Sequence, residues 1–267
     1  MKEYIQPKKN IYYKANAIKK DRPTLLFVHG LSGSSSAFLP YEKKFKEKYN
    51  VVSLDLRGHG KSIKHNKYEE YTLSKFANDI NDLIEYLKLE NIILIGHSFG
   101  ALIVLEFLSS YQNKIKAVVF LSPNYAVQKR KIAQVIKPFL AVTSIMKYLP
   151  FSYEIKGQVD YSFYENTGDW NLRRSIADIR NTSLPVYLYC TRQAYSFNKE
   201  RLLGEITVPT LIVHGKKDTI FPAQYSMEMA EKIKKSKLVL LDNADHIVVL
   251  NNFSEVSAAI QNFTESL

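Results

Sequence analysis

Residues 91–102 read NIILIGHSFGAL, and this stretch decides the fold. Its first half is an aliphatic, β-branched run typical of a buried strand, and its second half opens an apolar helix. Between the two halves, Gly96 and Gly100 stand two positions before and two positions after Ser98. A serine on a sharp strand-to-helix turn has crowded backbone on both sides, which explains the two glycines. The segment therefore predicts a nucleophilic serine raised above the end of a strand.

The glycine and serine spacing is weak evidence when it is taken alone. By composition, G-x-S-x-G occurs by chance in about one chain in ten of this length. The strand–turn–helix context strengthens the prediction, because such a turn also places the main-chain N–H of Phe99 at a helix start, where it can stabilise an oxyanion. A glycine-rich turn with an idle serine is the alternative interpretation.

Short apolar runs alternate with longer amphipathic stretches on both sides of this segment. The alternation predicts an α/β fold with a mostly parallel, doubly wound sheet of about eight strands. Most of the runs are almost continuously hydrophobic, as expected when helices cover both faces of the sheet. The expected strands span residues 24–29, 50–55, 91–96, 115–122, 209–215 and 236–242, with an edge strand or hairpin at 10–17.

Helices are expected at residues 72–88, 98–111, 222–235 and 253–263. In the first of these, apolar residues recur at intervals of three and four, which is typical of an amphipathic helix. Thr72 is a candidate N-cap for that helix. Pro222 suits the first turn of the third helix, where a missing N–H costs nothing.

The strand–helix alternation stops between residues 124 and 204, where no strand is expected. A connection of this length is usually an inserted subdomain rather than a loop. We therefore divide the chain into an α/β core domain, residues 1–123 and 205–267, and a helical cap, residues 124–204. Within the cap, the pattern predicts helices at residues 127–147, 169–180 and 185–197.

A serine is a poor nucleophile at its ordinary pKa and needs a base that is itself oriented. In open α/β sheets the active site lies at the carboxyl ends of the strands, so the partners of Ser98 are sought there. Asp218 follows the expected strand 209–215, and His246 follows the expected strand 236–242. We therefore expect Ser98 as the nucleophile, His246 as the general base and Asp218 as the acid that orients it.

Other residues compete for the last two roles. Asp242 and Asp245 are close to His246 in the sequence, but so near a carboxylate cannot easily reach the far nitrogen of the ring. Three of the other histidines, His29, His97 and His214, stand beside glycines at expected strand ends, where bracing a loop is the expected role. His65 lies in a polar loop and is expected to be solvated.

The second oxyanion donor is expected in the turn after the strand 24–29. This turn reads HGLSGS from residue 29 to residue 34, and the main-chain N–H of Leu31 is the candidate. With Phe99 it would complete a pair of donors facing the reacting carbonyl. An ordinary glycine turn is the alternative.

The sequence resembles the α/β-hydrolase fold family, in its branch of serine esterases and lipases with a helical cap. The pieces that carry the resemblance occur in the family's order: FVHGLSGSS at 27–35, DLRGHGKS at 55–62, GHSFG at 96–100, HGKKDTIFP at 214–222 and NADHI at 243–247. The chain order Ser98, Asp218, His246 is also the family's order. The resemblance implies that DLRGHGKS shapes a loop beside the site, with Asp55, Arg57 and His59 in structural roles.

The same resemblance implies acyl transfer from an acyl or aryl ester, through an acyl-enzyme and without a metal or organic cofactor. Serine at position 98 argues against haloalkane dehalogenase or epoxide hydrolase chemistry, which uses an aspartate nucleophile on a similar fold. Thioesterase, carbon–carbon bond hydrolase, perhydrolase and hydroxynitrile lyase activities use the same triad and stay open. A non-catalytic, ligand-binding homologue is the alternative from another class.

The predicted cap is rich in apolar and aromatic residues, which favours an apolar or aromatic small-molecule substrate, although the same residues also suit packing of cap helices on the core. Residues 128–147 begin QKRK and then turn apolar. Contact with a lipid surface through this segment is the weaker interpretation, and ordinary packing the stronger one. The apolar and aromatic residues of the predicted cap that favour such a substrate are Phe139, Leu140, Val142, Ile145, Met146, Tyr148, Leu149, Phe151, Tyr153, Tyr161, Phe163 and Tyr164.

The chain is basic, with 37 Lys and Arg against 26 Asp and Glu, a net charge of +11. The basic residues are spread through helix-like segments such as YEKKFKEKY, which indicates a solvated surface and no nucleic-acid partner.

A single cysteine, Cys190, excludes an internal disulfide and fits a reducing compartment. The first residues do not resemble a signal peptide, so a cytoplasmic location is expected, and the oligomeric state is not predicted.

Overall fold

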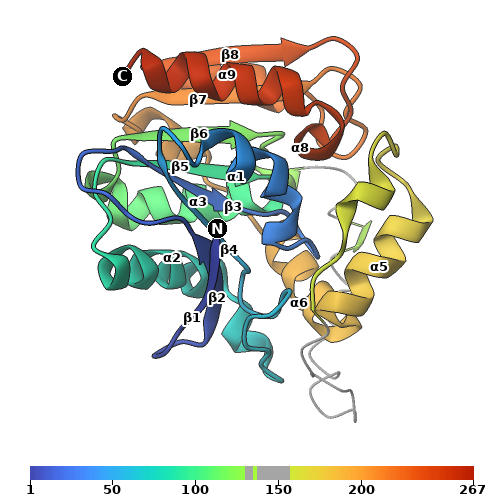
Figure 1. The fold of residues 1–267 in the computed structure, drawn as a ribbon. Helices are drawn as coiled ribbons and strands as arrows, with labels where there is room; N and C mark the ends of the chain where they lie inside the picture. The colour runs from blue at the N-terminus through green and yellow to red at the C-terminus, as the bar shows by residue number, and fades with distance from the viewer. Residues whose placement is uncertain (130–134, 137–156) are drawn as a thin grey trace.

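The computed structural model describes residues 1–129, 135–136 and 157–267. In these residues, eight strands form one sheet in the order β1-β2-β4-β3-β5-β6-β7-β8 (Figure 1). The first two pairings, β1 with β2 and β2 with β4, are antiparallel, and the others are parallel. The strands are β1 (Lys2–Gln6), β2 (Ile11–Ala15), β3 (Thr24–Val28), β4 (Asn50–Leu54), β5 (Ile92–His97), β6 (Ala117–Leu121), β7 (Thr210–Gly215) and β8 (Ser236–Leu241). The predicted α/β fold with a mostly parallel sheet of eight strands is confirmed.

Helices lie on both faces of this sheet (Figure 1). The α-helices are α1 (Leu39–Phe45), α2 (Leu73–Leu87), α3 (Phe99–Tyr111), α5 (Leu172–Thr182), α6 (Leu184–Tyr195), α7 (Gln224–Lys232), α8 (Val248–Asn251) and α9 (Phe253–Glu265). Short 3-10 helices occur at η1 (Ser35–Phe38), η2 (Tyr68–Tyr71), η3 (Gln112–Lys114), η4 (Val127–Lys129), η6 (Tyr161–Tyr164) and η7 (Glu200–Glu205). In the described part of the chain, no helix combines the length and apolarity needed to cross a bilayer.

The core consists of two buried hydrophobic layers, one on each face of the sheet. Successive strand residues point to opposite faces, so in β3 Leu25 and Phe27 join one layer while Leu26 and Val28 join the other. Helices α1 and α9 cover the first layer, and α2 and α3 cover the second. Burial on both faces explains why the parallel strands read as unbroken apolar runs.

Two details predicted for helix starts differ in the structure. Thr72 occupies the N-cap position of α2, as expected, but its side chain accepts no hydrogen bond from a main-chain N–H of the helix and lies 3.1 Å from the Ser74 hydroxyl. Helix α7 begins at Gln224, so Pro222 stands outside its first turn. The chain is held in a loop up to Phe221, whose carbonyl accepts a hydrogen bond from His214, and the helix can start only after that loop ends.

The segment predicted as a cap, residues 124–204, contributes no strand among its described residues. Helices α5 and α6 correspond to two of the three helices expected there, and Figure 1 shows them next to each other at one side of the core. Most of the expected helix 127–147 lies outside the described residues. So do nine of the apolar side chains on which the substrate prediction depended: Phe139, Leu140, Val142, Ile145, Met146, Tyr148, Leu149, Phe151 and Tyr153.

The loop after β4 is fixed by buried polar contacts, in agreement with the structural role expected for DLRGHGKS. Asp55 accepts hydrogen bonds from the main-chain N–H groups of Ser35, at 2.7 Å, and Lys61, at 2.8 Å. The Arg57 guanidinium makes a two-pronged ion pair with Asp79 of α2, with both N–O distances at 2.6 Å. Both members of this pair are buried.

Replacing Asp79 with alanine is expected to lower the free energy of unfolding by about 3 kcal/mol, because the buried charge of Arg57 would lose its two-pronged partner and keep only the longer ion pair with Glu70, at 3.3 Å. Urea denaturation followed by circular dichroism measures the change. Asp82→Ala is the matched control, since Asp82 is on the same helix and pairs with Lys9 in a part-exposed ion pair, for which about 1 kcal/mol or less is expected. Equal losses in the two variants would contradict a special role for the buried pair.

Candidate active site

Ser98 stands on the turn between β5 and α3, with φ 53° and ψ −115°. A positive φ is costly for any residue with a side chain, and such strain concentrates at functional positions. Glycine is needed on both sides of Ser98 because neighbouring backbone atoms lie too close to leave room for a Cβ atom. A Cβ at Gly96 would lie 2.7 Å from the Gly100 carbonyl oxygen, and a Cβ at Gly100 would lie 2.4 Å from the Val28 carbonyl oxygen.

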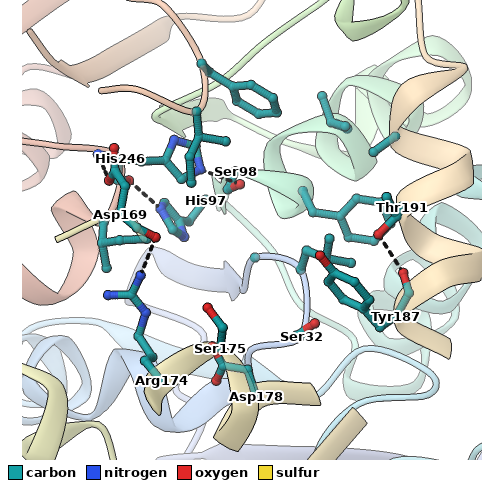
Figure 2. A pocket seen from close by; sticks show the side chains of 18 of the residues that line it. Ser32, His97, Ser98, Asp169, Arg174, Ser175, Asp178, Tyr187, Thr191 and His246 are labelled. Atoms are coloured by element: carbon teal, nitrogen blue, oxygen red, sulfur yellow. Dashed lines mark hydrogen bonds between the residues drawn. The ribbon is translucent and has the colours of Figure 1, made fainter. Parts of the chain in front are cut away.

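The structure brings together the three side chains that the sequence singled out. The Nε2 atom of His246 lies 2.7 Å from the Ser98 hydroxyl oxygen, and its Nδ1 atom lies 2.6 Å from Oδ2 of Asp218. Figure 2 shows the first of these contacts. The residues come from three loops that follow β5, β7 and β8, so parallel strand ends converge as expected.

Asp218 is fixed by hydrogen bonds to both of its oxygens. Oδ1 accepts from the main-chain N–H groups of Ile220, at 2.8 Å, and Phe221, at 2.7 Å. Oδ2 faces His246 and also lies 3.0 Å from Nε2 of His214. Burial opposes ionisation of this carboxyl, but the hydrogen bonds from the two histidines outweigh it and hold the pKa of Asp218 well below its ordinary value.

The rival carboxylates bind elsewhere. Asp242 forms a surface ion pair with Lys216 at 2.6 Å. Asp245 accepts hydrogen bonds from the main-chain N–H of Ile247, at 2.9 Å, and from the side-chain amide of Asn251, at 3.2 Å. Neither forms a hydrogen bond or ion pair with the ring of His246, which leaves Asp218 as its carboxylate partner within the described residues.

The other histidines at strand ends brace loops, as expected. His29 accepts from the main-chain N–H of Leu56 at 2.9 Å, and His97 donates to the carbonyl of His246 at 3.0 Å. Burial lowers the pKa of His29 to about 4 and the pKa of His97 to about 3, so both rings are neutral at pH 7. His214 is buried beside Asp218. His65, expected to be solvated, is half-buried instead.

The two expected oxyanion donors lie on the same cavity as Ser98. Leu31 follows β3 and Phe99 is the first residue of α3, and both line this cavity. Within the described residues, the main-chain N–H of neither is donated to another protein group. Both N–H groups are therefore available to a carbonyl oxygen bound beside Ser98.

The cavity has a volume of about 280 Å³ and two chemically different walls. Next to Ser98, the wall is apolar and includes Leu31, Phe99 and Leu102. The opposite wall comes from α5 and α6, as Figure 2 shows. Besides apolar residues such as Ile179 and Ala194, it carries polar side chains, those of Arg174, Ser175, Asp178, Tyr187 and Thr191. The arrangement suits a small molecule that carries both apolar and polar parts.

A family model described as the alpha/beta hydrolase fold matches residues 23–253 of the chain. The protein belongs to the α/β-hydrolase fold family. The family membership that the five sequence motifs predicted is thereby confirmed.

Relatives of this α/β hydrolase carry several different names. AB hydrolase superfamily protein YisY of Bacillus subtilis is 26% identical over 283 residues, covering 100% of both chains. Epoxide hydrolase 1 of Caenorhabditis elegans is 21% identical over 280 residues, covering 97% of this chain and 69% of the relative. Among solved structures, Est816, an N-acyl homoserine lactone degrading enzyme, superposes with a TM-score of 0.75 at 18% identity, covering 98% of this chain and 100% of Est816.

One residue of the α/β-hydrolase site was missed in the sequence. Asp169 accepts a hydrogen bond from the main-chain N–H of His246, at 2.7 Å (Figure 2). It also accepts one from the main-chain N–H of Thr219, at 2.9 Å. A carboxylate of the predicted cap thus ties together the loops that carry His246 and Asp218. The expected helix 169–180 was wrong at its start, since α5 begins at Leu172. The only local signal was an aspartate after a glycine, which is too common to identify it.

Proposed function

We propose that this protein is a serine hydrolase that cleaves a carboxylic ester through an acyl-enzyme on Ser98. The observation that carries the proposal is the continuous hydrogen-bonded chain from Ser98 through His246 to Asp218, with contacts of 2.7 and 2.6 Å. Two main-chain N–H groups of cavity-lining residues, those of Leu31 and Phe99, would complete the set of groups that acyl transfer requires.

In the first half of the reaction, the Ser98 oxygen attacks the ester carbonyl while Nε2 of His246 takes the hydroxyl proton. Asp218 stabilises the imidazolium that forms, and the N–H groups of Leu31 and Phe99 bind the negatively charged oxygen. The bond between the carbonyl carbon and the alcohol oxygen then breaks. His246 gives its proton to that oxygen, and the alcohol leaves.

The second half returns the enzyme to its starting state. His246 removes a proton from a water molecule, and the resulting hydroxide attacks the acyl carbonyl. The carbon–oxygen bond to Ser98 breaks, the serine oxygen regains the proton from His246, and the carboxylic acid is released. Buried His97 positions the base in both halves, because it donates to the main-chain carbonyl of His246 at 3.0 Å.

A small ester is the substrate class that these features favour. The cavity volume of about 280 Å³ suits a short acyl or aryl group. Est816, named for degrading a lactone, which is a cyclic ester, has the same fold. The epoxide hydrolase relative raises epoxide opening as a second candidate. A serine rather than a carboxylate at position 98 favours the ester, because epoxide hydrolases of this fold use an aspartate nucleophile.

Steady-state hydrolysis of p-nitrophenyl esters from acetate to palmitate tests this proposal. We expect turnover with a maximum of kcat/KM among the shorter chains, because the cavity next to Ser98 is small. Styrene oxide, followed by diol formation, is the parallel substrate for the epoxide alternative. Diol formation without turnover of any ester by folded protein would contradict the proposal, as would binding of esters without hydrolysis, which indicates a ligand-binding homologue.

A further inference from the structure

Helix α5 brings three polar side chains to the cavity wall opposite Ser98: Arg174, Ser175 and Asp178 (Figure 2). An ester made only of hydrocarbon groups would leave any polar atom of this wall that has no protein partner unpaired once water is displaced. Burying an unpaired polar group costs free energy, so a wall of this kind disfavours a purely aliphatic substrate. The wall can bind a substrate only through a side chain that still has a hydrogen-bonding atom without a protein partner.

Arg174 holds the neighbouring loop. It is buried, and its guanidinium donates to the Thr167 hydroxyl at 2.8 Å and to the carbonyl of Asp169 at 2.9 Å. The hydroxyl of Ser175 donates to the carbonyl of Asn171 at 3.0 Å. Both residues therefore have a structural partner that explains their presence.

Asp178 has one oxygen without a partner. Its Oδ1 accepts a hydrogen bond from the Tyr161 hydroxyl at 2.8 Å, which fixes the plane of the carboxyl group. Across the described parts of the chain, no group donates to Oδ2, and no cation lies within ion-pair distance of the carboxyl. Asp178 lines the same cavity as Ser98 and His246, so a bound substrate meets this oxygen.

The chemistry of the site favours a neutral hydroxyl as its ligand. Burial raises the pKa of Asp178 to about 7, so both protonation states are present near neutral pH. A hydroxyl donates to the carboxylate and accepts from the carboxylic acid, and it thus pairs with either state. A substrate ammonium pairs with the carboxylate alone and also meets the positive charge of Arg174, which is close enough to act on Asp178.

We propose that Oδ2 of Asp178 binds a hydroxyl group of the substrate, remote from the scissile bond, and that the natural substrate is a hydroxylated ester. The expected kinetic effect rests on the proposed ester hydrolysis, whereas the expected binding of the hydroxyl group does not. Tyr161 is a positioning residue, because it acts only through the carboxyl group that it orients.

The kinetic test compares matched ester pairs that differ in one terminal group. Acyl-arm pairs are p-nitrophenyl ω-hydroxyalkanoates and the alkanoates that carry a methyl in place of the hydroxyl. Alcohol-arm pairs are ω-hydroxyalkyl and alkyl butyrates, followed by acid release. The quantity compared is the kcat/KM of the hydroxyl ester divided by the kcat/KM of its methyl counterpart. In at least one series, this ratio is expected to be at least about tenfold lower in Asp178→Leu than in wild type, because the variant loses a hydrogen bond to a charged group.

Two variants keep this comparison interpretable. Asp178→Asn keeps the shape and a hydrogen-bonding side chain, so it is expected to recover part of the ratio. Asp160→Asn changes an exposed carboxylate outside the cavity and is expected to leave the ratio as in wild type. Thermal unfolding checks that each variant is folded. A ratio that stays at the wild-type value in folded Asp178→Leu, for every chain length in both series, would overturn the inference.

Calorimetry on the Ser98→Ala protein separates this inference from the proposed function. Binding of the hydroxylated ester is expected to be about tenfold tighter than binding of its methyl counterpart, and the difference is expected to vanish when Asp178→Leu is added. This readout needs no turnover. Equal affinities in the presence of Asp178 would overturn the hydroxyl site, whereas absent turnover together with a clear difference in affinity would overturn the ester hydrolase alone.

Discussion

Ser98→Ala is expected to lower kcat for p-nitrophenyl ester hydrolysis by a factor on the order of 10⁴ to 10⁶. The variant removes the oxygen that attacks the carbonyl, so His246 and the N–H groups of Leu31 and Phe99 are left to act on water alone. The change removes one partly buried oxygen and no packing contact of the strands, and the fold should persist. Release of p-nitrophenolate, measured with saturating ester, gives kcat directly.

Ser122→Ala is the matched control for this variant. Ser122 also directly follows a central strand, β6, and has a positive φ of 47°. Its hydroxyl has no partner within the described residues, and it does not line the cavity. We therefore expect kcat within about threefold of wild type. If Ser98→Ala kept more than about a hundredth of wild-type kcat, the assignment of the nucleophile would be wrong.

Asp218→Asn is expected to lower kcat by about 10³- to 10⁴-fold. The amide has nearly the shape of the carboxylate, but it holds the imidazole in the wrong tautomer and cannot stabilise the imidazolium. Because hydrogen bonds from His214 and His246 hold the pKa of Asp218 well below its ordinary value, this carboxylate stays ionised as the pH falls through the mildly acidic range. The wild type is thus expected to outperform Asp218→Asn at every pH between about 5 and 8.

The rival carboxylates supply the controls for this second prediction. Asp242→Asn breaks only an exposed ion pair with Lys216 and is expected to retain wild-type kcat. Asp245→Asn disturbs the loop that carries His246, through Asn251, and a loss of less than about tenfold is expected. A larger loss of kcat in either of these variants than in Asp218→Asn would show that the acid had been assigned wrongly.

The sequence predicted the sheet and the three facing side chains because both depend on local patterns. Burial on both faces makes each parallel strand a continuous apolar run, and strand ends in a parallel sheet meet at one edge. Asp218 and His246 directly follow β7 and β8, so their convergence on Ser98 follows from the strand order. Likewise, Gly96 and Gly100 were informative because no larger residue fits where they lie.

The polar wall could not be predicted, because it depends on how distant segments meet. Asp169 binds the main chain of His246, 77 residues further along the chain. Arg174 and Asp178 are four residues apart in α5, a spacing that in a sequence indicates an ordinary exposed ion pair on a helix surface. In the structure, each has other partners, and both line the cavity. The expectation of an apolar or aromatic substrate came from the composition of the predicted cap, which does not show which side chains line the cavity.

The most direct test of the central claim is the mass of the enzyme after reaction with p-nitrophenyl dimethylcarbamate. The serine oxygen attacks the carbamate carbonyl, p-nitrophenolate leaves, and the carbamoyl-serine persists because its carbonyl is a weak electrophile. We predict release of one p-nitrophenolate per chain and a carbamoyl group on the peptide that contains Ser98, with neither in Ser98→Ala. Carbamoylation at another residue, or the same release from Ser98→Ala, would contradict a catalytic serine at this position.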